Sequence, residues 1–176
     1  MTVNEVVTIG VYGLGNILLE DDGLGPCVIG ELNGRFTFPP HVEVDDLGTP
    51  GLDLVPYLSR RDAVIMVDAT SGSEPPGTLR VFRREDIIRH PPPARMSPHD
   101  PGLKESLQLV ELEQGRALDI CLVGVVVERT DHGTGLSEAV KDAVPAAVEA
   151  VLTELHRLGV RPAPKADAVS VEPWWT

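Results

Sequence analysis

The chain has 176 residues, of which 42% are hydrophobic, and a formal net charge of -12. These values predict a single globular domain with a sizeable core. The acidic charge argues against a nucleic-acid partner, because phosphate binding depends on clustered Lys and Arg. No window has the length and apolarity of a membrane span, and the first residues lack the pattern of a signal peptide, so we expect no membrane insertion.

The two cysteines, Cys27 and Cys121, show no metal-type spacing and provide no disulfide framework. Cys27 falls in an expected core-facing helix and Cys121 in an expected buried strand. We therefore expect both thiols to be buried, reduced and separate, since a free cysteine behaves as a small apolar residue. This cysteine usage favours a cytoplasmic location.

Five strands are expected, at about 6–12, 41–46, 62–68, 78–83 and 118–127. Most are short apolar runs, which is typical of strands buried in a parallel sheet. The segment 78–83 instead alternates apolar and polar residues and follows the previous strand after a short connection. It is therefore predicted to be an antiparallel edge strand, because parallel neighbours need crossovers of a dozen or more residues.

Helices are expected between these strands. One begins near Asp22 as a cap, with Pro26 in its first turn, and another begins at Leu103. The last carries apolar residues mostly four apart from Leu136 to Leu155, with Ser137 as its cap. The fold class is therefore a three-layer α/β sandwich with helices on both faces of the sheet. We expect one domain over residues 1–160 and a flexible tail over 161–176, which lacks periodicity.

The opening stretch "VTIGVYGLGNILLEDDGLGP" resembles the approach to a nucleotide phosphate, but its chemistry does not fit. Leu18 stands where a dinucleotide loop needs its third glycine, and Glu20, Asp21 and Asp22 would repel a phosphate. We therefore expect no nucleotide cofactor, although a nucleotide-binding enzyme stays a third alternative. Acids at a helix N-terminus interact well with its dipole, which accounts for one or two of the three.

Two further residues are candidates for the same edge of the sheet. Asp68 ends an apolar strand, and ligands of open α/β sheets bind outside the carboxyl ends of strands. A turn or capping role for Asp68 fits equally well. His99 in "SPHDPGL" lies at a loop-to-helix junction, where a plain surface histidine is the alternative, and His132 after the fifth strand could reach the same edge.

Two carboxylates and an imidazole suit Ni, Zn, Cd, Mn or Fe in an open site, and they are also compatible with metal-free carboxylate chemistry. The chain has no G-x-S-x-G nucleophile elbow and no H-E-x-x-H helix. Neither a serine hydrolase nor a zincin is therefore expected.

Together these segments resemble the hydrogenase maturation endopeptidases from about Val7 to Leu158. The most specific match is "GLGNILLEDDGLG", after which "GTPGLDLVPYL", "VIMVDA", "PGTLRVF", "SPHDPGL" and "LVGVVVE" occur in the order of the family. The resemblance implies an endopeptidase that trims the C-terminal extension of a nickel–iron hydrogenase large subunit after nickel insertion. It also implies that the substrate supplies the nickel and that the large-subunit precursor is the partner. We expect the chain to act as a monomer.

The metal-binding residues of the family fall on Asp22, Asp68 and His99. Asp22 stands where Glu also occurs, Asp100 where glutamine is common, and Val127 where proline is frequent; the first change shortens the reach to a metal. Both metal-assisted hydrolysis and a carboxylate general base stay open. A nickel-sensing module or chaperone that binds the large subunit without cutting it is the alternative function.

Overall fold

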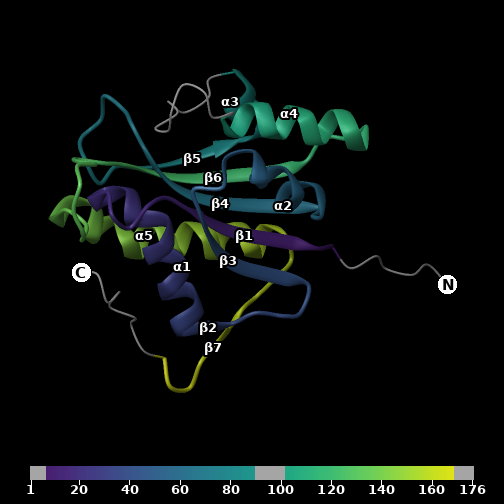
Figure 1. Ribbon diagram of the computed structural model, residues 1–176. Coiled ribbons are helices and arrows are strands. Elements are labelled where there is room, and N and C mark those ends of the chain that lie inside the picture. Colours follow the sequence, from purple (N-terminus) through teal and green to yellow (C-terminus); the bar gives the residue numbers. More distant parts are fainter. Residues whose placement is uncertain (1–6, 90–101, 169–176) are drawn as a thin grey trace.

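The computed structural model describes residues 7–89 and 102–168 (Figure 1). Its main sheet contains β1 (Ile9–Leu14), β3 (Val42–Gly48), β4 (Ala63–Thr70), β5 (Leu79–Arg83) and β6 (Asp119–Val126). The strand order is β3-β1-β4-β6-β5. All neighbouring strands are parallel except β5, which pairs with β6 in the antiparallel direction at one edge. The expected mostly parallel sheet and its antiparallel edge strand are confirmed.

Helices cover both faces of this sheet (Figure 1). One face carries α1 (Leu24–Arg35) and α5 (Glu138–Arg157), and the other carries α2 (Val55–Ser59), α3 (Arg84–Arg89) and α4 (Leu103–Gln114). The 3-10 helices η1 (Glu20–Gly23) and η2 (Gly51–Leu54) precede α1 and α2. The expected three-layer sandwich is therefore confirmed. None of the helices in 7–89 and 102–168 has both the length and the apolarity needed to cross a bilayer.

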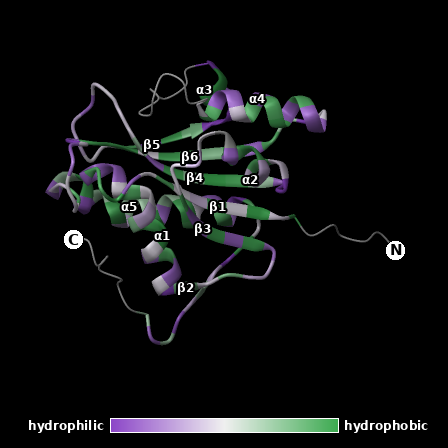
Figure 2. Cartoon of the chain, viewed as in Figure 1, coloured by the Kyte–Doolittle hydropathy of each residue, from purple (hydrophilic) through white to green (hydrophobic). Residues whose placement is uncertain are grey.

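The central strand β4 shows why these segments fold as they do. Residues Ala63 to Val67 are all buried, with Ile65 and Val67 packed in the layer of α1 and α5. Val64 and Met66 point to the opposite layer, which contains α2 and α4. A strand buried on both faces needs a continuous apolar run, and each large side chain buried there stabilises the fold by roughly 1.5–3 kcal/mol. Figure 2 shows most of β4 in the hydrophobic colour.

One strand boundary differs from the prediction in a way that affects the site. The sequence predicts that the third strand ends at Asp68, but β4 continues to Thr70. Asp68, Ala69 and Thr70 pair with Gly124, Val125 and Val126 of β6. Because Ala69 and Thr70 are buried against their neighbours, the ladder continues past the charged residue. Asp68 therefore lies inside the strand, close to its carboxyl end.

A small second sheet pairs the segment after α5 with the segment that follows α1. It consists of β2 (Phe36–Thr37) and β7 (Ala163–Pro164), which are antiparallel. The Lys165 backbone N–H donates to the Arg35 carbonyl at 2.9 Å, and Lys165 Nζ donates to the Asn33 carbonyl at 2.6 Å. These contacts fall within the segment 161–176, for which the sequence predicts a loose tail. Trp174 and Trp175 lie outside the described residues.

Both cysteines are buried and carry free thiols, as expected. Cys27 lies in α1 and Cys121 in β6, so they belong to different elements. Burial raises the pKa of the Cys27 thiol to about 11 and that of Cys121 to about 12. Since the thiolate is the reactive form, neither side chain is a candidate nucleophile.

Candidate active site

The turn after β1 folds back tightly onto Asp22. Gly15 has φ +134°, and a Cβ atom there would stand 1.8 Å from the Asp22 carbonyl oxygen. The Asn16 backbone N–H donates to Asp22 Oδ2 at 2.8 Å, while Asn16 Oδ1 accepts the N–H of Leu18 at 3.0 Å. The glycine turn therefore serves to bring the backbone into contact with Asp22 and to orient its carboxylate.

Asp22 itself differs from the prediction. It lies in η1, and the N-cap position of α1 is Gly23, which makes no side-chain capping bond. The expected capping role is wrong, because the carboxylate accepts a bond from the preceding turn instead. Asp22 is also only 9% exposed, so its side chain is largely covered although it lies near the edge of the sheet.

The three consecutive acids have three different surroundings. Glu20 adopts φ 45° and forms an ion pair with Arg129, with 3.2 Å between Oε1 and Nε. Asp21 is fully buried, and its carboxylate accepts hydrogen bonds from residues 128, 129 and 137. Asp22 faces the turn after β1. The sequence does not predict the role of Asp21. The one indication in the sequence is that three consecutive acids are more than the dipole of a single helix N-terminus accounts for.

The loop between β6 and α5 lies against this opening turn. Gly133 forms an isolated bridge with Leu19, donates its N–H to the Leu18 carbonyl at 3.0 Å and accepts the Glu20 N–H at 3.1 Å. His132 is exposed in this loop. The loop therefore reaches the same edge, as the sequence suggested for His132.

Asp68 approaches this edge from the neighbouring strand. By the alternation along β4, its half-buried side chain shares a face with Val64 and Met66, on the side of α2 and α4. The element η1 contacts β4. In addition, a Cβ atom at Gly25 would stand 2.8 Å from the carbonyl oxygen of Val67, next to Asp68. The structure thus brings the segments that carry Asp22 and Asp68 together.

The third predicted residue, His99, lies outside the described residues. It precedes α4, which covers the face to which Asp68 points. Within 7–89 and 102–168 no three His, Cys, Asp or Glu side chains are arranged to hold a metal. The described part of the edge therefore contributes carboxylates, which can bind a cation through oxygen or act as a base toward water.

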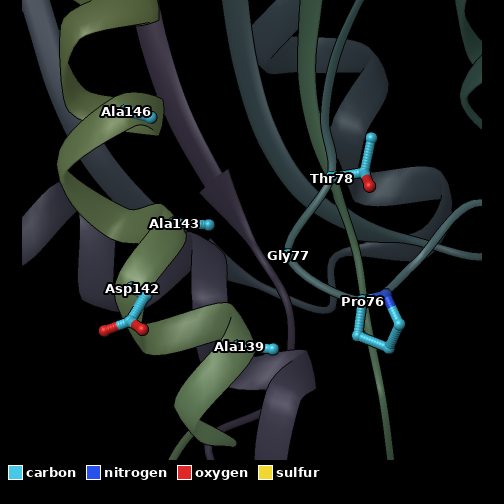
Figure 3. Close-up of a pocket in the computed structure, with 7 residues that line it drawn as sticks. All are labelled: Pro76, Gly77, Thr78, Ala139, Asp142, Ala143 and Ala146. Carbon is cyan, nitrogen blue, oxygen red and sulfur yellow. The ribbon is translucent and has the colours of Figure 1, made fainter.

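A shallow pocket of about 430 Å³ lies at the carboxyl end of β6, between the loop before β5 and the first turns of α5. Its lining is mostly small and apolar (Figure 3). In Figure 3 the methyl groups of Ala139 and Ala143 point toward this loop, while the Asp142 carboxylate points away from it. The pocket offers contact surface rather than reactive groups. Its residues are Pro76, Gly77, Thr78, Ala139, Asp142, Ala143 and Ala146.

Comparison with known proteins identifies relatives of this chain. The sequence profile described as "Hydrogenase maturation protease" matches residues 26–154, a range that includes Asp68 and His99 and begins just after Asp22. The hydrogenase 2 maturation protease of Escherichia coli K12 is 34% identical over 160 residues, which cover 88% of this chain and 94% of that protein. The hydrogenase expression/formation protein HoxM of Cupriavidus necator is 34% identical over 166 residues, covering 90% and 82%.

Solved structures show the same relationship. The hydrogenase maturating endopeptidase HybD from E. coli superimposes with a TM-score of 0.81 at 33% identity, covering 91% of this chain and 99% of that one. The maturation protease HycI from Thermococcus kodakarensis, at 22% identity, has a TM-score of 0.67 over 84% and 92% of the two chains. The second likeness supports the fold alone.

Proposed function

This chain belongs to the hydrogenase maturation protease family, whose members hydrolyse peptide bonds, and we infer that it removes the C-terminal extension of a nickel–iron hydrogenase large subunit after nickel insertion. The observation that carries this proposal is the contact between η1 and β4, which brings the segments of Asp22 and Asp68 to one sheet edge. A carboxylate pair at one sheet edge suits a peptide that arrives with its own cation.

In this proposal Asp22 and Asp68, together with His99, bind the nickel that the precursor already contains. The nickel is then part of the substrate and reports that the large subunit is loaded. Oxygen and nitrogen donors suit nickel better than they suit a metal that selects thiolate ligands. Both Cys27 and Cys121 are buried, so the proposed ligand set contains no thiolate.

Two routes lead from this complex to peptide hydrolysis. In the first, the cation polarises the scissile carbonyl while the carboxylates hold it in place. In the second, Asp22 or Asp68 accepts a proton from the attacking water as a general base. The bond from the Asn16 N–H to Asp22 Oδ2 fixes the direction of that carboxylate in either route.

The same proposal includes a cellular location, an oligomeric state and a partner. We place the protein in the cytoplasm, as a monomer whose partner is the nickel-loaded precursor. The two free, buried thiols support a reducing compartment. Residues 1–160 form the peptidase domain in this proposal, and 161–176 its tail.

The deciding experiment incubates the protein with nickel-loaded and nickel-free precursor and weighs the products by mass spectrometry. We expect a shortened large subunit from the loaded precursor and none from the nickel-free precursor. A loaded precursor that stays intact while bound would instead identify a non-cleaving nickel-sensing chaperone. Cleavage of both precursors alike would remove the recognition of nickel from the proposal.

A further inference from the structure

Asp21 is a fully buried carboxylate with four hydrogen-bond donors around it. Its Oδ2 accepts the backbone N–H of Glu128 at 2.9 Å, the N–H of Arg129 at 3.0 Å and the hydroxyl of Ser137 at 2.9 Å. Its Oδ1 accepts the backbone N–H of Ser137 at 2.6 Å. A buried charge is tolerated only when it is satisfied in this way, because an unpartnered carboxylate loses its hydration.

Ser137, which donates two hydrogen bonds to Asp21, also lies at the N-terminus of α5, the longest described helix. Ser137 occupies the N-cap position of α5, as the sequence predicts, but its hydroxyl makes no capping bond within its own helix. The hydroxyl donates to Asp21 instead. A carboxylate beside a helix N-terminus is stabilised by the helix dipole and by the N–H groups there. Asp21 therefore caps α5 from a distant part of the chain.

Asp21 and Asp22 are consecutive residues, and hydrogen bonds restrain the backbone at both of them. The Asp21 N–H donates to the Arg129 carbonyl at 3.3 Å, and the Asp22 N–H donates to the Leu19 carbonyl at 3.0 Å. Glu20, on the other side, has the left-handed φ of 45°, which a non-glycine residue keeps only when its surroundings hold it there. The orientation of the Asp22 carboxylate thus depends on where the Asp21 carboxylate is held.

We propose that Asp21 is a positioning residue of the peptidase, which locks the loop 127–137 and the N-terminus of α5 to η1 and so fixes Asp22 at the sheet edge. This role rests on the proposed function. Asp21 does not meet the substrate itself, since it is fully buried beneath the loop. Its contribution is to hold the neighbouring carboxylate in the reactive geometry, for which an error of about 1 Å costs roughly a hundredfold in rate.

The test compares Asp21→Asn with Glu154→Gln. Asparagine keeps the shape but turns an NH₂ group toward N–H donors. Glu154 is the matched control, because it is 4% exposed and lies near the opposite end of the same helix, where Arg83 and Arg157 bind it. Both variants are assayed for cleavage of nickel-loaded precursor below their melting temperatures, with kcat and KM measured separately. Ser137→Ala, which removes one donor of the four, provides a milder variant should Asp21→Asn fail to fold.

We expect kcat to fall at least about tenfold in Asp21→Asn and by a smaller factor in Ser137→Ala, with KM changed less than about twofold. Glu154→Gln should keep the kcat of the unmodified protein although it is destabilised. Equal kcat values for Asp21→Asn and Glu154→Gln would overturn the proposal, because they would show a purely structural role.

Hydrogen exchange provides a readout that does not depend on cleavage. Asp21→Asn should speed exchange of the amides of Asn16 and Asp22 by at least about tenfold, and Glu154→Gln should leave them unchanged. Unchanged exchange in Asp21→Asn would refute the locking of η1. If the unmodified protein cleaves no precursor, the proposed function fails, and the exchange result alone then decides whether Asp21 holds Asp22.

Discussion

Gly15 and Asp22 are in contact through their backbones, with no room for a side chain between them: a Cβ atom at Gly15 would stand 1.8 Å from the Asp22 carbonyl oxygen. The φ of Gly15, +134°, is itself one that other residues rarely adopt. Gly15→Ala should therefore lower the free energy of unfolding by about 2 kcal/mol or more and abolish precursor cleavage. Urea denaturation and the cleavage assay measure the two effects.

Gly30→Ala is the matched control for this prediction. Gly30 lies inside α1, and a Cβ atom there would meet nothing within 4 Å. Alanine should raise the free energy of unfolding by about 0.5–1 kcal/mol, because it restricts the unfolded chain and favours the helix. A Gly15→Ala protein as stable and active as the unmodified one would contradict the tight turn.

Asp68→Asn should reduce the cleavage rate at least about a hundredfold, whether the carboxylate binds the cation or acts as a base. Asp22→Asn should do the same. Asp53→Asn, which changes an exposed acid of η2, should leave the rate unchanged. Cleavage at the normal rate by Asp68→Asn would remove the chemical basis of the proposed site.

His99→Ala should weaken nickel binding most clearly near neutral pH, where the imidazole is largely available as a neutral ligand. Isothermal titration with nickel alone, on the folded variant, measures this effect apart from cleavage. His132→Ala is the comparison, since His132 lies exposed in the loop that packs on the opening turn. A larger loss of nickel binding in His132→Ala than in His99→Ala would transfer the ligand role to His132.

The thiols of Cys27 and Cys121 should react slowly in the native protein. Burial raises the pKa of Cys27 from 9.0 to about 11, so its thiolate population near pH 8 falls about a hundredfold. A chromogenic disulfide reagent should therefore label both only after unfolding. Because ionisation is suppressed in the folded state alone, the free energy of unfolding should fall as the pH rises from 9.0 toward the folded-state pKa values. Fast labelling of the native protein at both positions would contradict this burial.

Glu111 should make a pH-dependent contribution to stability. Arg84 donates to both of its oxygens at 2.6 Å, which lowers the pKa of Glu111 below its usual 4.5, and the Leu118 N–H adds a bond at 2.9 Å. Glu111→Gln should lower the free energy of unfolding by about 1–2 kcal/mol at pH 7. The difference should shrink below pH 4.5 and vanish below the folded-state pKa, because the carboxylate is then protonated in both states.

The control for this prediction is Glu113→Gln, which changes an exposed acid on the same helix. Its free energy of unfolding should stay close to that of the unmodified protein across the same pH range. A stability difference for Glu111→Gln that persists unchanged at pH 2 would contradict the charge-dependent role.

The strands and long helices could be predicted because burial imposes a local pattern on the sequence. Ala63 to Val67 form a short apolar run of the kind that a strand covered on both faces requires, and the apolar repeat of α5 is equally local. The surroundings of the three acids could not be predicted in this way. They depend on the left-handed backbone of Glu20 and on donors in residues 128–137, which no short window of sequence contains.

The end of β4 illustrates the same limit. A charged residue after an apolar run usually marks the end of a strand, yet pairing with β6 continues for two residues past Asp68. The apolar residues of β6 opposite that end, Val125 and Val126, decide the outcome, and they lie far along the chain.

The bonds between Asp21 and Ser137 also order the events of folding. The two residues are separated by 116 positions, and a contact of that range forms only after the intervening chain has been closed into a loop. During synthesis Asp21 emerges from the ribosome long before Ser137, so its carboxylate has no helix N-terminus to bind until β6 and the start of α5 have followed. The edge that carries Asp22 is therefore completed late, and a growing chain holds no finished peptidase.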